Sequence, residues 1–151
     1  MMYPTAEDSL AAIIETFERV IAPLVDDEYG SSLCLTVGQM LRSVRTRVAL
    51  EGQVLDQDNH DLRTLLTELR SEVPASLATD IDATTARRAD QYRPLEELQA
   101  DAADLRRVLE VCISAIPDRT CDTRAKIREY LTRHLERQQP WLINAFTGPR
   151  R

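Results

Sequence analysis

The chain has 151 residues and a formal net charge of −6, with 19 basic and 25 acidic side chains and only four glycines. A chain of this length can bury about 70% of the surface that its unfolded form exposes, so we predict a single domain over residues 1–151. An acidic chain in which 5% of the residues are aromatic has little general tendency to bind nucleic acid, and we expect no nucleic-acid partner.

A first helix is predicted to begin near Thr5. Thr5 and Asp8, three residues apart, form a capping box, and Pro4 precedes them. Apolar residues then recur at helical spacing as far as Leu24, and we expect Pro23 to kink the helix or to begin a short last turn. Residues 1–30 contain seven acidic side chains and one basic side chain, so this end of the chain is acidic.

The central stretch carries the clearest pattern of the chain. Read in steps of four and three, eight of its ten positions are aliphatic, and the two exceptions are both acidic. These steps put all ten positions on one face of a helix, which is typical of a long bundle helix. An isolated charge in a dry seam is costly, so each acid needs a partner, water, a metal or a break in the helix. The ten positions are Val37, Leu41, Val44, Val48, Glu51, Leu55, Asp58, Leu62, Leu65 and Leu69.

Two interpretations of this stretch stay open. Gly52 costs about 1 kcal/mol relative to alanine inside a helix, and Asp56, Asp58 and Asn59 are good N-cap residues, which favours two helices over 31–53 and 58–72. The register continues across Gly52, however, and an independent second helix would have no reason to keep the phase of the first. We therefore favour one helix, continuous or kinked.

The rest of the chain predicts further helices. Residues 75–93 are mostly polar, with Leu77, Ile81 and Tyr92 as exceptions, and we expect a partly helical, exposed connection there. A helix is predicted over residues 94–116, and another over about 122–139, after which Pro140 bends the chain into a terminal turn that plugs one end of the bundle. The predicted fold is all-α: an up-and-down helical bundle of about four main helices with one long central helix.

Four residues are candidates for a ligand or metal site: Glu51, Asp58, Asp61 and His134. Carboxylates from facing helices are the ligands that hard divalent cations prefer. The motifs of helical metal enzymes are incomplete here, since Gln57 and Leu131 stand three residues before the two histidines, where a Glu-x-x-His pair needs glutamate. The alternative is structural: the acids cap helices, form a buried polar interaction that fixes the helix register, or lie at a solvated corner. In that case His134 is a core histidine paired with Glu51 or Asp58.

The last predicted helix is basic, which suggests an exposed polar face or a docking surface for an acidic protein partner. No helix-turn-helix, zinc, phosphate-loop, dinucleotide or kinase motif is present, so we predict no catalytic residue and no cofactor. The basic side chains are Arg124, Lys126, Arg128, Arg133 and Arg137.

One segment resembles a known group of sequences. Residues 56–66 contain an Asp-Asn-x-x-Leu-Arg-x-Leu run at Asp58–Leu65, and a Pro-x-Val-Asp-Asp-x-Tyr corner precedes it at 23–29. In this respect the chain resembles small uncharacterised helical bacterial proteins with an acidic run of this kind. The resemblance covers about residues 20–66 and implies a bacterial helical protein, without implying an activity.

Three features of the sequence predict a cytoplasmic protein. The N-terminal residues have no basic segment followed by an apolar core, no apolar run approaches the ~20 residues that a membrane span needs, and the three cysteines form no CxxC pair.

A continuous helix over residues 31–70 would be ~60 Å long, more than a compact domain of this size spans. Either the helix kinks near Gly52, or its projecting part packs against a second copy of the chain. Our first hypothesis is the second copy: a non-enzymatic homodimeric bundle acting as an interaction or accessory module. The alternative is a divalent-metal-dependent enzyme or small-ligand-binding bundle.

Overall fold

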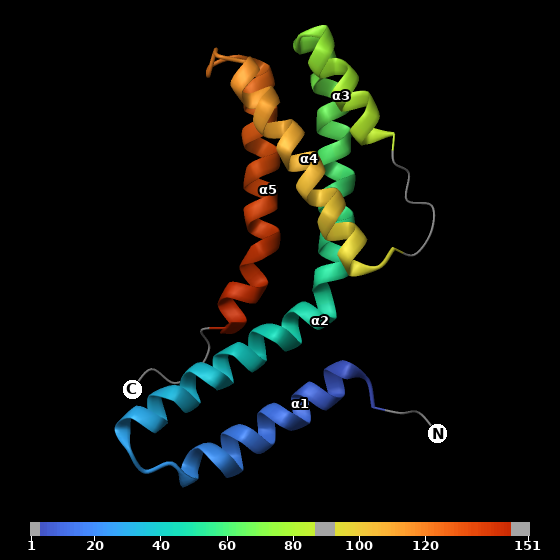
Figure 1. Cartoon of the computed structure of the whole chain (residues 1–151). Helices are drawn as coiled ribbons and strands as arrows, with labels where there is room; N and C mark the ends of the chain where they lie inside the picture. The colour runs from blue at the N-terminus through green and yellow to red at the C-terminus, as the bar shows by residue number, and fades with distance from the viewer. Residues whose placement is uncertain (1–3, 87–92, 146–151) are drawn as a thin grey trace. The chain divides into compact units, whose positions relative to one another are not determined.

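The computed structural model describes residues 4–86 and 93–145, the last five of these by their backbone only (Figure 1). Over these ranges the chain is helical and has no strand, which confirms the all-α prediction. Short π and 3-10 turns connect some of the helices. The helices are α1 (Ala6–Thr16), α2 (Glu28–Leu69), α3 (Ala75–Thr85), α4 (Leu95–Ala115) and α5 (Asp122–Ala145).

The chain divides into two compact units, and the division falls inside α2. The first unit comprises residues 1–51 and 138–151, and the second comprises residues 52–137. The predicted single domain stays a prediction.

Helix α2 runs for 42 residues without a break, so one long central helix is confirmed and the two-helix interpretation is wrong. Asp58 and Asn59, considered as N-caps, lie inside the helix and are buried. A Cβ added at Gly52 would meet nothing within 4 Å, so no close packing requires the glycine. Its cost of about 1 kcal/mol is small beside the hydrogen bonds and packing of a helix this long.

In the first unit, α1 lies alongside the N-terminal half of α2 (Figure 1). The predicted capping box is present, since the Thr5 hydroxyl accepts a hydrogen bond from the Asp8 amide and the Asp8 carboxylate accepts one from the Thr5 amide. A π-turn over Phe17–Ile21 and a 3-10 turn over Ala22–Leu24 follow, so a short last turn is present, with Pro23 as its middle residue.

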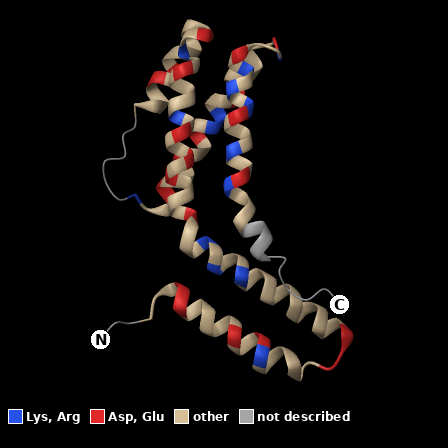
Figure 2. Cartoon of the chain, turned by 180° about the vertical axis from the view of Figure 1, so that it is seen from behind, with Lys and Arg blue, Asp and Glu red and all other residues tan. Residues whose placement is uncertain are grey.

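Opposite charges join the two helices of this hairpin. Glu18 pairs with Arg42, and Glu7 pairs with Arg45 at 3.3 Å. Figure 2 shows the acidic residues on α1 and the basic residues on the N-terminal half of α2. The corner between them needs a glycine at position 30, because a Cβ there would lie 2.4 Å from the Val25 side chain. The ion pairs between the helices and the tight corner at Gly30 together stabilise the antiparallel hairpin.

In the second unit, α3, α4 and α5 pack around the C-terminal half of α2 (Figure 1). Leu62, Leu65 and Leu69, which are buried in this unit, keep the four-and-three spacing that predicted the seam of α2. The core consists of Leu62, Leu65, Leu66, Leu69, Leu77, Ile81, Leu105, Val108, Leu109, Cys112, Ile116, Ile127 and Tyr130.

The prediction for residues 75–93 needs a correction. Residues 75–85 form a regular helix, and Leu77 and Ile81 are buried in the core instead of exposed. These two residues are four apart and so lie on one face of α3, which makes even a mostly polar helix amphipathic. Arg70 adds a bidentate ion pair to Asp82, with N–O distances of 2.6 and 2.8 Å. Tyr92 lies outside the described residues.

The end of the last helix also differs from the prediction. Helix α5 continues through Pro140 to Ala145 instead of ending at Gln139. Proline removes one backbone hydrogen bond, to the carbonyl of Glu136, and the helix tolerates this loss within two turns of its end. The side chains of the predicted terminal plug, residues 141–146, lie outside those described. No helix in the described part of the chain has both the length and the apolarity of a membrane span.

Candidate functional site

The second unit encloses a charged residue, Asp58, which is 2% exposed. Asp58 lies on the same face of α2 as Leu62, Leu65 and Leu69, all of which are buried. The register of the helix therefore carries the carboxylate into the core. A buried carboxylate is tolerated only where charges and hydrogen bonds compensate for its lost hydration.

Side chains from two other helices supply this compensation. Arg106 of α4 donates to Asp58 Oδ2 at 3.0 Å, and the Tyr130 hydroxyl donates to the same oxygen at 3.2 Å. His134 Nδ1 lies 3.0 Å from each carboxylate oxygen, and Arg137 Nη1 donates to Oδ1 at 3.0 Å. Residues 130, 134 and 137 follow steps of four and three and so share one face of α5. Asp58 and these four partners form the Asp58 network.

The network determines the charge state of the carboxylate. Burial by itself raises the pKa of Asp58, but the hydrogen bonds from His134 and Arg106 and the charges behind them outweigh it and hold the pKa below its ordinary value. Burial likewise raises the pKa of the Tyr130 phenol, and the neighbouring Asp58 charge raises it further. Asp58 is therefore the anion of the cluster and Tyr130 a neutral donor.

Asp61 extends the network by one turn of α2. Arg137 pairs with Asp61 as well as with Asp58, and Gln57 donates to Asp61 at 2.8 Å. Burial raises the pKa of Asp61, but Arg137 and Gln57 bring it below the ordinary value. One guanidinium thus bridges two carboxylates on successive turns of α2, which ties α5 to α2.

A second buried carboxylate joins α2 to the start of α4. Asp101 is 1% exposed and pairs with Arg63 of α2 and with Arg93, the latter at 2.8 Å. Beside it, the buried Asn59 side chain donates to the carbonyl of Leu98 at 2.9 Å. The second unit therefore holds two ionic clusters, and each joins α2 to another helix.

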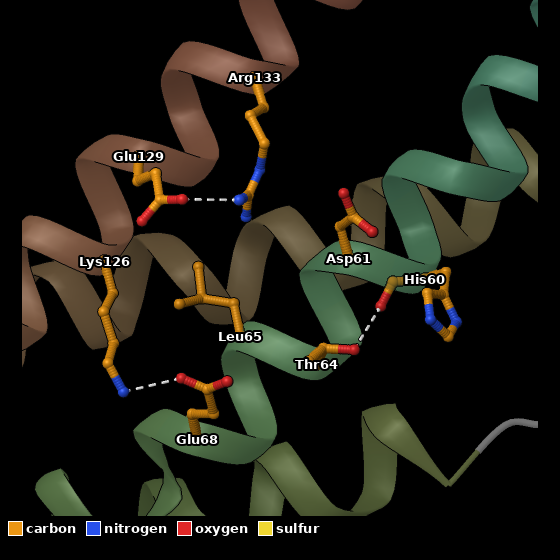
Figure 3. A pocket seen from close by; sticks show the side chains of 8 residues that line it. All are labelled: His60, Asp61, Thr64, Leu65, Glu68, Lys126, Glu129 and Arg133. Carbon is orange, nitrogen blue, oxygen red and sulfur yellow. Dashed lines mark hydrogen bonds and ion pairs between the residues drawn. The ribbon is translucent and has the colours of Figure 1, made fainter.

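A pocket of about 460 Å³ lies between α2 and α5 near the Asp58 network (Figure 3). Lys126 and Arg133, on its α5 side, are each engaged by a carboxylate, Glu68 at 2.8 Å and Glu129 at 2.8 Å. The pocket therefore offers a compensated polar surface. Ligand pockets are usually lined by apolar side chains with a few precisely placed polar groups, whereas the basic groups of this pocket already pair with carboxylates.

The basic face of α5 is similarly occupied. Lys126, Arg133 and Arg137 pair with carboxylates, and Arg124 and Arg128 donate to the backbone carbonyls of residues 116 and 119. Each of the five basic side chains singled out in the sequence thus has an interaction within the chain. Docking of an acidic protein on this face stays a prediction, and it would have to compete with these contacts.

The structure brings together three of the four residues proposed from the sequence. Asp58, Asp61 and His134 lie in one cluster, and the pairing of His134 with Asp58 is present as anticipated. Glu51 is the last α2 residue that belongs to the first unit, and it is half-buried. His60, which stood next to the acids in sequence, is exposed, and its backbone carbonyl accepts a hydrogen bond from Thr64.

The chemistry of this cluster differs from that of a metal centre. Among the described residues, no three histidine, cysteine, aspartate or glutamate side chains are grouped so that they could hold a metal ion. Both oxygens of Asp58 already accept hydrogen bonds, and two guanidinium groups supply positive charge where a cation would have to sit. The metal-binding alternative on Glu51, Asp58, Asp61 and His134 stays a prediction that no observation favours.

The remaining members of the clusters were not identified from the sequence. Arg106 and Asp101 were not singled out, and Arg137 was assigned to an exposed polar face or a docking surface. One signal was present, because residues 130, 134 and 137 share a helix face with the apolar Ile127. When polar or charged residues lie on an otherwise apolar helix face, they indicate a buried hydrogen-bond partner or a buried opposite charge.

Comparisons with other proteins add no relative. Neither the family models, nor the curated proteins, nor the solved structures contain a match to this chain. The resemblance to small helical bacterial proteins over residues 20–66 stays a prediction. Function is therefore argued from the two units themselves.

Proposed function

We propose that this protein is a non-catalytic homodimeric helical bundle that acts as an interaction or accessory module, and that the hairpin of its first unit forms the dimer interface. One observation carries the proposal: the hairpin is built from amphipathic helices but leaves most of its large apolar side chains exposed. Among the described residues of this unit, the exposed ones are Ile13, Val20, Ile21, Leu24, Tyr29, Leu33, Leu35, Val37, Met40, Val44 and Val48.

Five of these residues form a continuous stripe along α2, which we call the α2 stripe: Leu33, Val37, Met40, Val44 and Val48. They are separated by steps of four, three, four and four, so they share one helix face, and each is between 41% and 63% exposed. Contiguous exposed apolar surface of this kind is typical of a protein interaction site. The stripe continues the seam of the buried half of α2.

A second copy of the chain is the occupant that fits this stripe. In a two-fold dimer the same patch serves both partners, so an apolar stripe meets an apolar stripe without unpaired charge. Burying the exposed half of one aliphatic side chain contributes about 1 kcal/mol. The five stripe residues of each of the two copies make ten side chains, and burying them contributes about 10 kcal/mol. This is comparable with the free-energy cost of association, roughly 4–15 kcal/mol. The apolar residues of α1 must therefore contribute too, which favours two hairpins packing as four helices.

Two further features support the proposal. The Asp58 network is suited to joining helices, since its carboxylate is already saturated and a reacting group must be accessible to its substrate. Cys34, Cys112 and Cys121 are free thiols, which is typical of a reducing compartment and supports the cytoplasm as the location.

Light scattering across a concentration series tests this proposal. We expect a dimer mass that does not change over micromolar concentrations for the wild type, and a monomer for the double variant Val44→Glu with Val48→Glu. Val111→Glu is a matched control, because Val111 is exposed to the same extent as Val44, 48% against 47%, but lies on α4 in the second unit. A monomeric wild type, or a double variant that remains dimeric, would contradict the proposal.

A further inference from the structure

The part of α2 that belongs to the first unit has an uncharged end and a charged end. Residues 29–41 contain no charged side chain, whereas the next ten residues contain four, and Figure 2 shows this difference along the helix. Two of the four, Arg42 and Arg45, form ion pairs with acidic side chains of α1. The other two charged side chains are Arg47 and Glu51.

Arg47 and Glu51 lie beside the α2 stripe. They follow Val44 and Val48 by three residues each, so they stay on the same side of the helix. Arg47 is exposed and Glu51 is half-buried. A helix that packs on the stripe therefore meets a basic and an acidic side chain at one end and no charge at the other.

The direction of a second copy decides what these charges meet. In a parallel two-fold dimer each seam residue lies beside the same residue of the second copy, so the two Glu51 carboxylates would face each other. Like charges that face each other across an interface are strongly unfavourable. In an antiparallel dimer centred on the stripe the two Glu51 residues lie ~32 Å apart, well beyond the screening length of about 8 Å at physiological salt.

We propose that the two copies pack antiparallel through the α2 stripe, with the two-fold axis next to Met40. This inference rests on the proposed dimer and adds the direction of its partner. The stripe is centred between residues 40 and 41, so reversing one copy sets Val37 against Val44 of the second copy. Apolar side chains then meet apolar side chains along the whole stripe.

The antiparallel register also gives the charged end a suitable neighbour. Arg47 and Glu51 lie over residues 30–34 of the second copy, which contain no charge. Tyr29, which is 75% exposed, comes to the level of Glu51 of the second copy. A phenol donates well to a carboxylate, so each end of the interface gains a hydrogen bond in place of a like-charge contact.

Disulfide cross-linking of single-cysteine variants measures the direction. In the full-length background protein, serine replaces the two half-buried cysteines, and the buried third cysteine stays. Met40→Cys, Val37→Cys and Val44→Cys are introduced one at a time, all at exposed positions where the fold tolerates the change. A disulfide forms only where the two Cα atoms come within about 7 Å of each other.

We expect Val37→Cys and Val44→Cys to remain unlinked when each is oxidised by itself. In the antiparallel dimer the two copies of either residue lie ~10 Å apart along the helix axis, which is too far for a disulfide. When the two variants are mixed under reducing conditions and then oxidised, a disulfide between positions 37 and 44 should form, as identified by peptide mass spectrometry. Met40→Cys should link to itself, because it lies next to the axis.

The outcomes separate this inference from the proposed dimer. If Met40→Cys links to itself but the mixed disulfide between positions 37 and 44 does not form, the antiparallel direction is wrong and the dimer stands. If Met40→Cys does not link to itself, the α2 stripe is not the interface, and both proposals fail.

A charge at position 29 tests the direction without cysteines. In the antiparallel dimer Tyr29→Lys faces Glu51 of the second copy, so its dimer Kd should be about fivefold lower than that of Tyr29→Glu, measured by analytical ultracentrifugation. Adding Glu51→Gln to both variants should remove most of this difference. In a parallel dimer position 29 lies ~33 Å from Glu51, so equal Kd values for the two Tyr29 variants would overturn the inference.

Discussion

The two units use one helix in different ways. In the second unit, α2 contributes Leu62, Leu65, Leu66 and Leu69 to a closed core, whereas in the first unit the same repeat along α2 stays largely exposed. Of the buried apolar residues among those described, only Ile14 belongs to the first unit. The second unit therefore has a core of its own, whereas the described part of the first unit leaves most of its large apolar side chains exposed.

The buried carboxylates follow the same division, although the second unit also has exposed ion pairs such as Arg70–Asp82. Asp58 and Asp101 are buried among several partners in the second unit, while the Glu7–Arg45 pair of the first unit is about half exposed on both sides. Exposed pairs typically contribute 0 to about 1 kcal/mol, but removing one partner of a buried pair costs about 3–5 kcal/mol. The comparison predicts that equivalent changes in the two units differ severalfold in their effect on stability.

Removing a core leucine should give the largest effect. Leu66 is 0% exposed, so Leu66→Ala should lower the free energy of unfolding of the second unit by about 3–5 kcal/mol, measured by urea denaturation. Leu33→Ala removes the same atoms at a site that is 47% exposed and should cost about 1 kcal/mol or less in the monomer. If the dimer exists, the effect of Leu33→Ala should grow with protein concentration. If Leu33→Ala and Leu66→Ala lowered the free energy of unfolding equally at all protein concentrations, the first unit would have a closed core too.

Removing the charge of Asp58 should have the next largest effect. Asp58→Asn leaves Arg106, Arg137 and His134 around a neutral amide and should cost about 3 kcal/mol, near the lower bound for buried pairs because Arg106 is partly solvated. Asp82→Asn is the control, since Asp82 is an exposed partner of Arg70, and it should shift the urea midpoint much less than Asp58→Asn does. Similar urea midpoints for the two variants would rule out a structural role for the Asp58 network.

Acid should weaken the second unit through the same carboxylates. The pKa values of Asp58 and Asp61 are lower in the folded protein than their ordinary value of 3.8. The stability that they contribute is therefore fully present at neutral pH and is lost as the pH falls from about 4 through their folded pKa values. Each unit of pKa depression corresponds to about 1.4 kcal/mol. Urea denaturation from pH 7 to pH 2 should show this loss, and Asp58→Asn should reduce it; an unchanged pH profile in that variant would contradict the assignment.

Removing the helix cap of α1 should give the smallest effect, confined to the first unit. Thr5→Ala deletes the hydroxyl that accepts from the Asp8 amide and should cost about 1 kcal/mol. Hydrogen exchange should become faster at the amides of residues 6–16, while those of α4 remain protected as in the wild type. Faster exchange in α4 would indicate that the two units unfold together.

Local signals in the sequence placed most of the helices. The Thr5–Asp8 box, Pro94 at the start of α4 and the four-and-three spacing of α2 each act within about one turn or along one helix face, so they are readable without a fold. Where prediction failed, other contacts outweighed the local signal. Helix α3 forms because Leu77 and Ile81 reach the core, and α5 passes Pro140 because one lost hydrogen bond does not end a helix.

The sequence by itself determined that the chain is helical, that α2 is long, and that Asp58 shares a face with leucines and so needs a partner. It also suggested His134 as that partner. Only the tertiary structure decided that Arg106, Tyr130 and Arg137 join them, since these residues are 48–79 positions away along the chain. Likewise, only packing decided which half of α2 is buried. Periodicity specifies which residues share a face, but what covers that face depends on segments that are distant in sequence.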